Sequence, residues 1–200
     1  MADLIAVVAA YLVGSIPFAQ LLSKRRGIDL RRVGSGNVGA SNVLRTLGVQ
    51  PAVVAMMLDA VKGTVAVLVA QRLTNGVAAP VMAGLASMIG HVYPVWLRFR
   101  GGKGVATAAG AFAVLTPVAV AAAMGVFLLT VALTRFISVG SMAAALTLAG
   151  WAIASDAPTV VAIGAAIGAA LVIIGHRANV LRLVAGTERR VGQRGVRELT

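Results

Sequence analysis

Residues 4–22 read LIAVVAAYLVGSIPFAQLL and contain no charged side chain. The hydrocarbon core of a bilayer is ~30 Å thick, and a helix needs ~20 apolar residues to cross it. This stretch is therefore long enough for one membrane span. Gly14, Ser15 and Pro17 lie inside it, and a proline removes one helical hydrogen bond, so we expect a kink at this point.

The composition of the whole chain also indicates a membrane protein. Of the 200 residues, 59% are apolar and 12% are charged, whereas soluble domains are ~45–50% apolar and ~25% charged. The net charge of +12 is compatible with nucleic-acid binding or with an anionic membrane surface, and the mean hydropathy of +0.92 favours the membrane. We therefore expect no nucleic-acid partner, and one integral-membrane domain over residues 1–200.

The residue types restrict the chemistry that the chain can perform. It has no cysteine and only two histidines, which excludes a disulfide scaffold and a cysteine nucleophile and leaves little scope for a histidine-rich metal site. We expect neither a bound metal nor a cofactor. The chain has few carboxylates and no cysteine. This composition suits a substrate that carries its own leaving group, because such a substrate has little need of a covalent nucleophile from the protein.

Six further apolar segments follow the first, at residues 51–71, 77–97, 104–115, 116–133, 138–154 and 159–175. With the first, they predict an all-α integral membrane protein, a polytopic bundle of about seven transmembrane helices. The segment 104–115 is short for a span, so a re-entrant helix is an alternative. A five-span arrangement, with this segment and a neighbour in the interface, would leave both chain ends on the same sides as seven spans do.

Positive charge is concentrated on one side of this arrangement. The loops after the first, third, fifth and seventh spans, with the C-terminal tail, hold 16 of the 18 Lys and Arg residues. By the positive-inside rule this side is cytoplasmic, so the C-terminus is cytoplasmic and the N-terminus lies outside. The basic tail at residues 189–197 is interpreted as a topology determinant only. The exceptions are Lys62, inside a span, and Arg72, in the second loop.

A glycine-rich loop, GSGNVGASN at residues 34–42, is the first candidate for chemistry. Its glycines allow backbone N–H groups to turn inward as an anion nest, and its Ser and Asn side chains add donors. A helix that starts near residue 41 would add its N-terminus and an arginine one turn later. The alternative is a glycine-rich turn that enters a helix. The candidate residues are Gly34, Ser35, Gly36, Asn37, Gly39, Ser41, Asn42 and Arg45.

Two charged residues lie inside the second apolar segment. Asp59 and Lys62 are three residues apart, which places them on one face of a helix. Ionisable groups are costly inside a span, so we expect these two to pair with each other. Their role is then structural, and the functional alternative is that they orient the catalytic loop.

The segment RFRGGKG, residues 98–104, follows the third span. Its glycines present Lys103 at the start of the next helix, where a point cation and backbone N–H groups together suit a phosphate. The two arginines of the segment are interpreted as topology signals. His91, near the end of the preceding span, is interpreted as a hydrogen-bonded core histidine.

The last candidates follow the seventh span. His176 and Asn179 are three residues apart, so a helix would point both the same way, toward the membrane interface. Ser141, at the cytoplasmic start of the sixth span, is either a helix cap or a further donor. Glu188, in the tail, is assigned a supporting role. Because these polar residues all fall on the cytoplasmic side, we expect one anion site assembled from several loops.

At these residues the chain resembles the PlsY family, the integral-membrane acyl-phosphate:glycerol-3-phosphate acyltransferases of bacteria. The resemblance runs nearly end to end, and its departures are mild: Ser41 stands where the family usually has Thr, and Arg98 and Arg100 where Lys is common. The motifs that carry it are Gly14-Ser15-Ile16-Pro17-Phe18, Asp29 with Arg31, residues 34–42 with Arg45, Asp59-x-x-Lys62-Gly63, residues 91–107, residues 137–141 and His176-Arg177-x-Asn179.

The resemblance implies acyl transfer from a fatty acyl phosphate to the 1-hydroxyl of sn-glycerol 3-phosphate, giving lysophosphatidic acid and phosphate, the first step of phospholipid synthesis. It implies a location in the bacterial cytoplasmic (inner) membrane, with the active site facing the cytoplasm, and no obligate protein partner. A transporter of phosphorylated metabolites and a lipid-sensing scaffold subunit are the alternatives.

The same resemblance suggests roles for the candidate residues. The loop 34–39, with Ser35 and Asn37, would hold the acyl-phosphate head, and the cations of Arg45 and Lys103 would neutralise phosphate charge. Ser141, His176 and Asn179 would place glycerol 3-phosphate. His176 would act as general base, unless a substrate phosphate accepts the proton instead.

Overall fold

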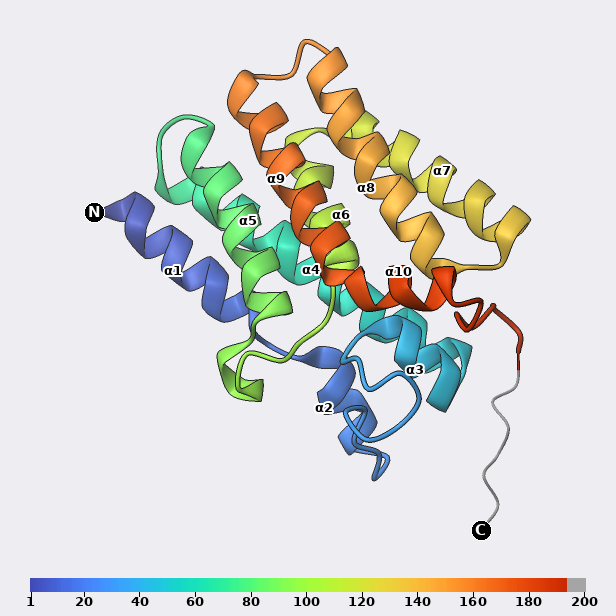
Figure 1. Ribbon diagram of the computed structural model, residues 1–200. Helices are drawn as coiled ribbons and strands as arrows, with labels where there is room; N and C mark the ends of the chain where they lie inside the picture. The colour runs from blue at the N-terminus through green and yellow to red at the C-terminus, as the bar shows by residue number, and fades with distance from the viewer. Residues whose placement is uncertain (194–200) are drawn as a thin grey trace.

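The computed structural model describes residues 1–193, and every regular element in that part of the chain is a helix (Figure 1). The helices are α1 (Ala2–Gly14), α2 (Phe18–Lys24), α3 (Ala40–Leu47), α4 (Val49–Leu73), α5 (Ala78–Val92), the 3-10 helix η1 (Val95–Leu97), α6 (Val105–Leu115), α7 (Pro117–Thr134), α8 (Ile137–Ala154), α9 (Thr159–Gly175) and α10 (Arg177–Val184). The all-α prediction is confirmed. The tail residues 194–200, including Arg194 and Arg197, lie outside the described residues.

The first apolar stretch is broken where its sequence predicts a kink. α1 ends at Gly14 and α2 begins at Phe18, after Pro17. Proline has no backbone N–H, so the helical hydrogen bonds are interrupted here. Ile16 lies between the two helices, and its carbonyl therefore belongs to neither helix's ladder of hydrogen bonds. The Lys62 ammonium, from α4, donates to that carbonyl at 2.9 Å. The break between α1 and α2 is therefore stabilised by a hydrogen bond from a charged residue of another span.

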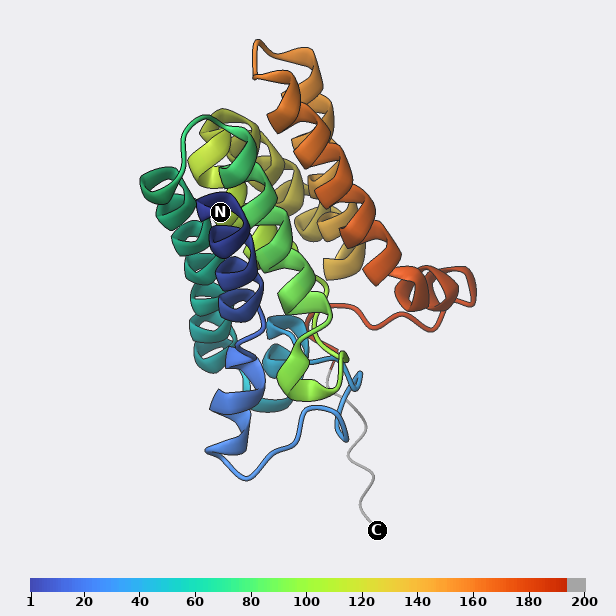
Figure 2. The same cartoon turned by 90° about the vertical axis from the view of Figure 1, so that its left-hand side faces the viewer.

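The long helices form two groups that pack side by side (Figures 1 and 2). In the first group α1, α4 and α5 contact one another, and α6 packs along α4. In the second group α7 and α9 flank α8. Contacts of α9 with α5 and α6 join the two groups, and the buried side chains Met88, Phe112 and Val172 fill the space between them.

Small residues let these helices approach closely, as the Ala- and Gly-rich spans predict. A methyl group added to Gly110 on α6 would lie 1.9 Å from the carbonyl oxygen of Ala60 on α4. One added to Gly164 on α9 would lie 2.4 Å from a methyl carbon of Val81 on α5. The Gly164-x-x-x-Gly168 spacing therefore places two small residues where α9 packs against α5 and α6.

Five helical segments within residues 1–193 are long and apolar enough to cross a membrane, and the bent pair α9–α10 makes up to six. The five are Ala2–Lys24, Val49–Leu73, Ala78–Leu97, Pro117–Thr134 and Ile137–Ala154. By length and composition, the described residues therefore contain five or six candidate membrane spans, fewer than the seven or so predicted from the sequence. The short helix is α6, whose 11 residues span only ~16 Å. It is covered by α4, α5, α7 and α9.

Candidate active site

The glycine-rich loop connects α2 to α3. Gly34 and Gly36 have φ angles of 63° and 71°, in the left-handed region that glycine adopts without strain. Gly39 differs, because its φ of −142° is extended, and it caps α3, which begins at Ala40 near the expected position. Two left-handed glycines in three residues turn the chain sharply, and the tip of the loop is exposed at the end of the bundle.

Asn42 shapes this loop from inside. Its side chain is fully buried, its Oδ1 accepts the N–H of Ser35 at 3.0 Å, and its Nδ2 donates to the carbonyls of Leu30 at 3.1 Å and Val33 at 3.0 Å. The amide is thus fully used within the protein. The sequence suggested that Asn42 donates to substrate. Its contacts indicate instead that Asn42 supports the shape of the loop.

The candidate serines lie in different surroundings. Ser35 is exposed in the loop, and Ser41 is half-buried in the first turn of α3. Ser141 is buried on α8, with 3% of its surface exposed. Because α8 begins at Ile137 and its N-cap is Phe136, the helix-cap interpretation of Ser141 is wrong. The interpretation of this buried hydroxyl as a donor stays open.

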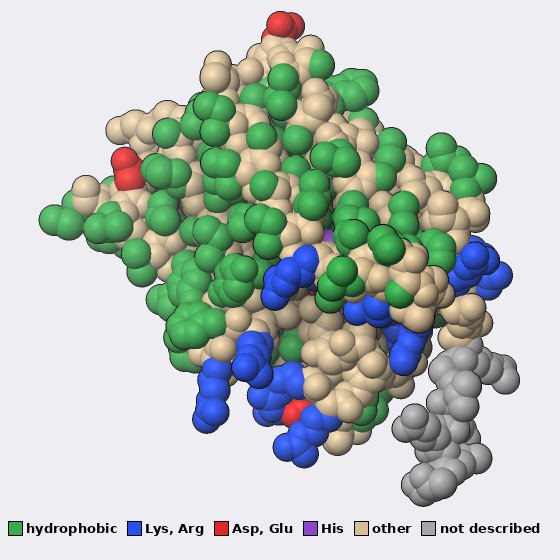
Figure 3. All heavy atoms as spheres, viewed as in Figure 1, with side chains coloured by type: hydrophobic (Ala, Val, Ile, Leu, Met, Phe, Trp, Pro, Cys, Tyr) green, Lys and Arg blue, Asp and Glu red, His purple; other side chains and the backbone are tan. Residues whose placement is uncertain are grey.

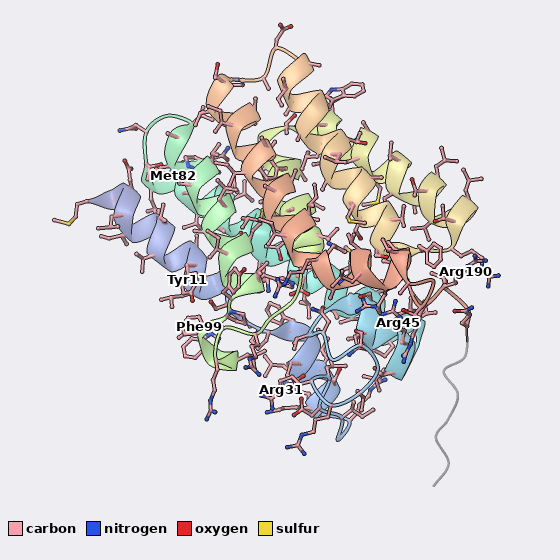
Figure 4. The ribbon with its side chains drawn as sticks, in the orientation of Figure 1. Tyr11, Arg31, Arg45, Met82, Phe99 and Arg190 are labelled. Atoms are coloured by element: carbon pink, nitrogen blue, oxygen red, sulfur yellow. The ribbon has the colours of Figure 1, made fainter. Side chains whose placement is uncertain are left out.

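Arg45 lies one turn into α3 and points toward the segment that follows α10 (Figure 4). Burial lowers the pKa of its guanidinium, the nearby Glu188 carboxylate opposes that shift, and Arg182 and Arg189 add to it. Arginine remains protonated despite such shifts. Arg45 is therefore one member of a group of cations gathered around a single carboxylate.

Lys103 reaches the same group from the loop before α6. Its ammonium donates a hydrogen bond to Oδ1 of Asn179, on α10. Burial lowers the pKa of Lys103 to about 8, Glu188 opposes this shift, and the charges of Arg182 and Arg45 contribute to it. An ammonium has three donors, so the bond to Asn179 leaves two of them for an anion.

Glu188 is the centre of this network. Its Oε1 accepts hydrogen bonds from Asn179 Nδ2 at 2.6 Å and from Ser138 Oγ at 2.9 Å, and its Oε2 accepts from Arg182 Nε at 2.7 Å. Burial alone would raise the pKa of this carboxyl, but the hydrogen bonds from Asn179, Arg182 and Ser138 bring it below its ordinary value. The carboxylate therefore stays charged and orients the Asn179 amide toward Lys103.

The segment after α10 is held against the turn between α7 and α8. Val191 N–H donates to the carbonyl of Arg135 at 2.8 Å, and the Arg135 guanidinium donates to the carbonyl of Val191 at 2.8 Å. The Arg190 guanidinium lies 5.1 Å from the ring centre of Phe136. The start of the basic tail therefore has a packing role beyond the topology signal inferred from the sequence, because it fixes the position of Glu188.

His176 lies between α9 and α10, with 2% of its surface exposed. Its Nδ1 is 2.7 Å from the carbonyl oxygen of Val172. A carbonyl only accepts, so Nδ1 carries the hydrogen, and Nε2 is the nitrogen with a free lone pair. This tautomer is the one that a general base at Nε2 requires.

Comparison with known proteins identifies the family. The family model described as "Glycerol-3-phosphate acyltransferase" matches residues 4–186. The chain belongs to the glycerol-3-phosphate acyltransferase family. It is 43% identical to the glycerol-3-phosphate acyltransferase of Desulforamulus reducens, over 94% of each chain. It is 45% identical to that of Geobacter sulfurreducens, over 94% of this chain and 97% of the relative.

Solved structures of an acyltransferase of this family share the whole fold. The glycerol 3-phosphate form of PlsY, described as an integral membrane glycerol 3-phosphate acyltransferase, superposes with a TM-score of 0.92 at 39% identity, over 96% of each chain. Its lysophosphatidic acid form gives a TM-score of 0.89 at 38% identity, over 96% of each chain. The resemblance to the PlsY family inferred from the sequence motifs is confirmed.

The structure brings most of the candidate residues of this acyltransferase to one end of the bundle. Asn37 Nδ2 donates to the carbonyl of Gly101 at 3.3 Å, which joins the glycine-rich loop to the loop of Lys103. Asp59 and Lys62 form the expected ion pair, at 2.9 Å, in the interior beneath these loops. Ser138 and Arg182, which the sequence did not single out as site residues, are partners of Glu188. A signal for the site was present, because Glu188 is the single acidic residue between 176 and 193.

Proposed function

We propose that this chain transfers a fatty acyl group from an acyl phosphate to the 1-hydroxyl of sn-glycerol 3-phosphate. Membership of the glycerol-3-phosphate acyltransferase family supports the reaction class and the acceptor. The observation that carries the assignment to this site is the network in which Glu188 holds Asn179 against Lys103, with Arg45 and Arg182 beside it. It concentrates positive charge next to a glycine-rich loop, as two phosphorylated substrates require. The family does not favour the alternative of a transporter.

The reaction needs little covalent chemistry from the protein. The 1-hydroxyl oxygen attacks the acyl carbon and forms the ester bond, while the bond from that carbon to the phosphate oxygen breaks and phosphate leaves with the electron pair. Because an acyl phosphate is a mixed anhydride with a good leaving group, positioning and charge stabilisation can supply most of the rate. The hydroxyl proton passes to Nε2 of His176 or to a substrate phosphate.

We assign the acyl-phosphate head to the loop 34–39, with Ser35 and Asn37. Lys103 and Arg45 neutralise the phosphate charge of the two substrates. Ser141, His176 and Asn179 place glycerol 3-phosphate. The support is that the Glu188 carboxylate raises the pKa of both Lys103 and Arg45, against the effect of their burial, although the two cations come from different parts of the chain.

Purified protein given palmitoyl phosphate and glycerol 3-phosphate tests the reaction, with each substrate omitted in turn and palmitoyl-CoA as a parallel donor. Phosphate and lysophosphatidic acid are expected together, and only with the acyl phosphate. Product with palmitoyl-CoA alone would overturn the donor assignment. No product with either donor, from folded protein, would overturn the proposed function, and net uptake of labelled glycerol 3-phosphate into sealed vesicles would then support the transporter.

For the membrane, we propose seven crossings in the bacterial inner membrane, with the N-terminus outside and the active site and C-terminus on the cytoplasmic side. The ends of α1, α5, α7 and α9 lie at the same end of the bundle (Figures 1 and 2). Lys and Arg side chains gather over this end on the face shown in Figure 3, as the positive-inside rule requires. The short α6 counts as a crossing because it starts at this end and α7 starts at the other.

A labelling experiment is expected to give this orientation. The chain has no cysteine, so single cysteines can be introduced without removing others. In intact spheroplasts, a membrane-impermeant thiol reagent should label Asp156→Cys, in the turn between α8 and α9, and should label Arg26→Cys, after α2, only after permeabilisation. Labelling of Arg26→Cys in intact spheroplasts would reverse the proposed orientation.

The pH dependence of the reaction should reflect Lys103. Burial lowers its pKa to about 8, so the charged form that binds phosphate is present below that pH and is lost above it. The kcat/KM for glycerol 3-phosphate reports groups of the free enzyme and is expected to fall about tenfold per pH unit above pH 8. In Lys103→Arg the fall should move to higher pH, because a guanidinium stays protonated. An unchanged fall in that variant would assign the titration to another group.

A further inference from the structure

A buried group of charged side chains lies beneath the two substrate loops, outside the phosphate network. Asp59 and Lys62 on α4 form an ion pair of 2.9 Å, and their side chains are 3% and 2% exposed. His91, on α5, places its Nδ1 3.5 Å from Oδ1 of Asp59. Lys62 also donates to the carbonyl of Ile16, at the break between α1 and α2. One cluster therefore connects three spans.

His91 is in direct contact with the loop that carries Lys103. Its carbonyl accepts the N–H of Gly102 at 3.0 Å, and the carbonyl of Val92 accepts the N–H of Gly101 at 3.0 Å. A methyl group added to Gly102 would lie 2.0 Å from Nε2 of His91. The imidazole ring thus packs directly against the backbone of the residue that precedes Lys103.

The glycine-rich loop is tied to the same place. Asn37 donates to the carbonyl of Gly101, and Val38 lines a small cavity with Asp59, Lys62 and His91. The cluster therefore lies under both loops that the proposed function assigns to phosphate binding. No part of it belongs to the Glu188 network.

Stability alone is a poor explanation for this cluster. Ion pairs buried in a protein seldom stabilise it more than apolar side chains of the same size, and charges inside a span are costly. Buried ionic groups can instead be retained for conformational specificity, because a charge in a dry interior has few alternative partners. The energetic cost of burying these charges is explained if catalysis depends on the position of the 101–103 loop.

We propose that Asp59, Lys62 and His91 form a positioning cluster that fixes the 101–103 loop relative to α4 and α5 and so places the Lys103 ammonium at the phosphate site. Asp59 orients the His91 ring, Lys62 anchors Asp59 to the helix break, and the ring fixes Gly102. These are positioning residues, which act through Lys103 and do not touch substrate. The inference rests on the proposed function, because it concerns the placement of a residue of that site.

The test replaces His91 with asparagine. Asn reproduces a donor at the Nδ1 position, facing Asp59, but removes the ring edge that contacts Gly102. A misplacement of about 1 Å caused by a mutation away from the chemistry can cost about 10²-fold in rate. We therefore expect kcat/KM for glycerol 3-phosphate to fall by up to about 10²-fold, mainly through a higher KM. The fall of kcat/KM above pH 8, which is the basic limb of the pH profile, should also shift, because Lys103 moves to a different environment.

Gly102→Ala tests the same contact from the loop side. It leaves Asp59, Lys62 and His91 in place and displaces the loop, so it should also raise KM and shift the basic limb. The matched control is Ser87→Ala, another buried polar residue on α5, whose hydroxyl donates only to the carbonyl of Gly84. The control should leave KM and the basic limb unchanged.

The outcomes separate the inference from the proposed function. An inactive wild-type protein would overturn the proposed function, and the inference with it. An active wild type whose folded His91→Asn and Gly102→Ala variants keep the wild-type KM and basic limb would overturn the inference alone. If His91→Asn does not fold, the double variant Asp59→Asn/Lys62→Met, which removes both charges together, and Gly102→Ala decide by the same two measurements.

Discussion

Lys103→Met is expected to lower kcat/KM for glycerol 3-phosphate by roughly 10²–10³-fold, the cost of removing one preorganised charge at a reacting group. Methionine keeps most of the length and apolar character of the lysine stem and removes only the ammonium. The bond to Oδ1 of Asn179 is lost as well, but Nδ2 of the same amide still donates to Glu188. The loss should therefore appear in activity far more than in thermal stability.

The measurement is steady-state release of phosphate with palmitoyl phosphate as donor, together with a thermal melt of the detergent-solubilised protein. Arg100→Met is the matched control, because Arg100 is an exposed cation on the same loop that we interpret as a topology signal. It should stay within twofold of wild type. Equal losses in the two variants would mean that the loop contributes only general positive charge.

Gly34→Ala is expected to lower kcat/KM by about 10²-fold, because small misplacements of a positioning loop can cost that much. Gly34 has a φ of 63°, and a methyl group there would lie 2.2 Å from Oδ1 of Asn42. The alanine would displace the Asn42 amide from its three hydrogen bonds and open the loop.

Gly27→Ala separates this clash from backbone strain. Gly27 has a φ of 74°, and a methyl group added to it meets no atom within 4 Å. The two alanine variants therefore carry similar backbone strain, and only Gly34→Ala disturbs Asn42. Kinetics with both substrates varied should show near-normal values for Gly27→Ala. If it loses as much activity as Gly34→Ala, strain and not the contact with Asn42 is the cause.

Much of this site could be predicted from the sequence because its features are local. Pro17 interrupts the helical hydrogen bonds in the middle of an apolar stretch, Gly34 and Gly36 permit left-handed turns, and the pair Asp59 and Lys62 is set by helical spacing. These properties depend on residues a few positions apart. The family motifs, which occur in the expected order along the chain, additionally indicated the reaction.

Other assignments depended on which segments meet in space. Nothing near Glu188 in the sequence indicates that Ser138 and Asn179 donate to it, since Ser138 comes from the start of α8. Asn42 was expected to be a substrate donor because it is one of the polar side chains in the glycine-rich loop 34–42. The structure directs that amide inward to Leu30 and Val33, which no local pattern reveals.

The sequence by itself determined an all-helical membrane protein, its broken first span, the charge asymmetry of its loops and the candidate residues for phosphate binding. Only the tertiary structure decided that Lys103 meets Asn179, that Glu188 is the centre of the cations, and that His91 supports Gly102. The physical reason is range: helix formation and turns are set by neighbouring residues. Burial and hydrogen-bond partners instead depend on distant segments, such as those of Lys103 and Asn179, 76 residues apart, that pack only when the whole bundle has formed.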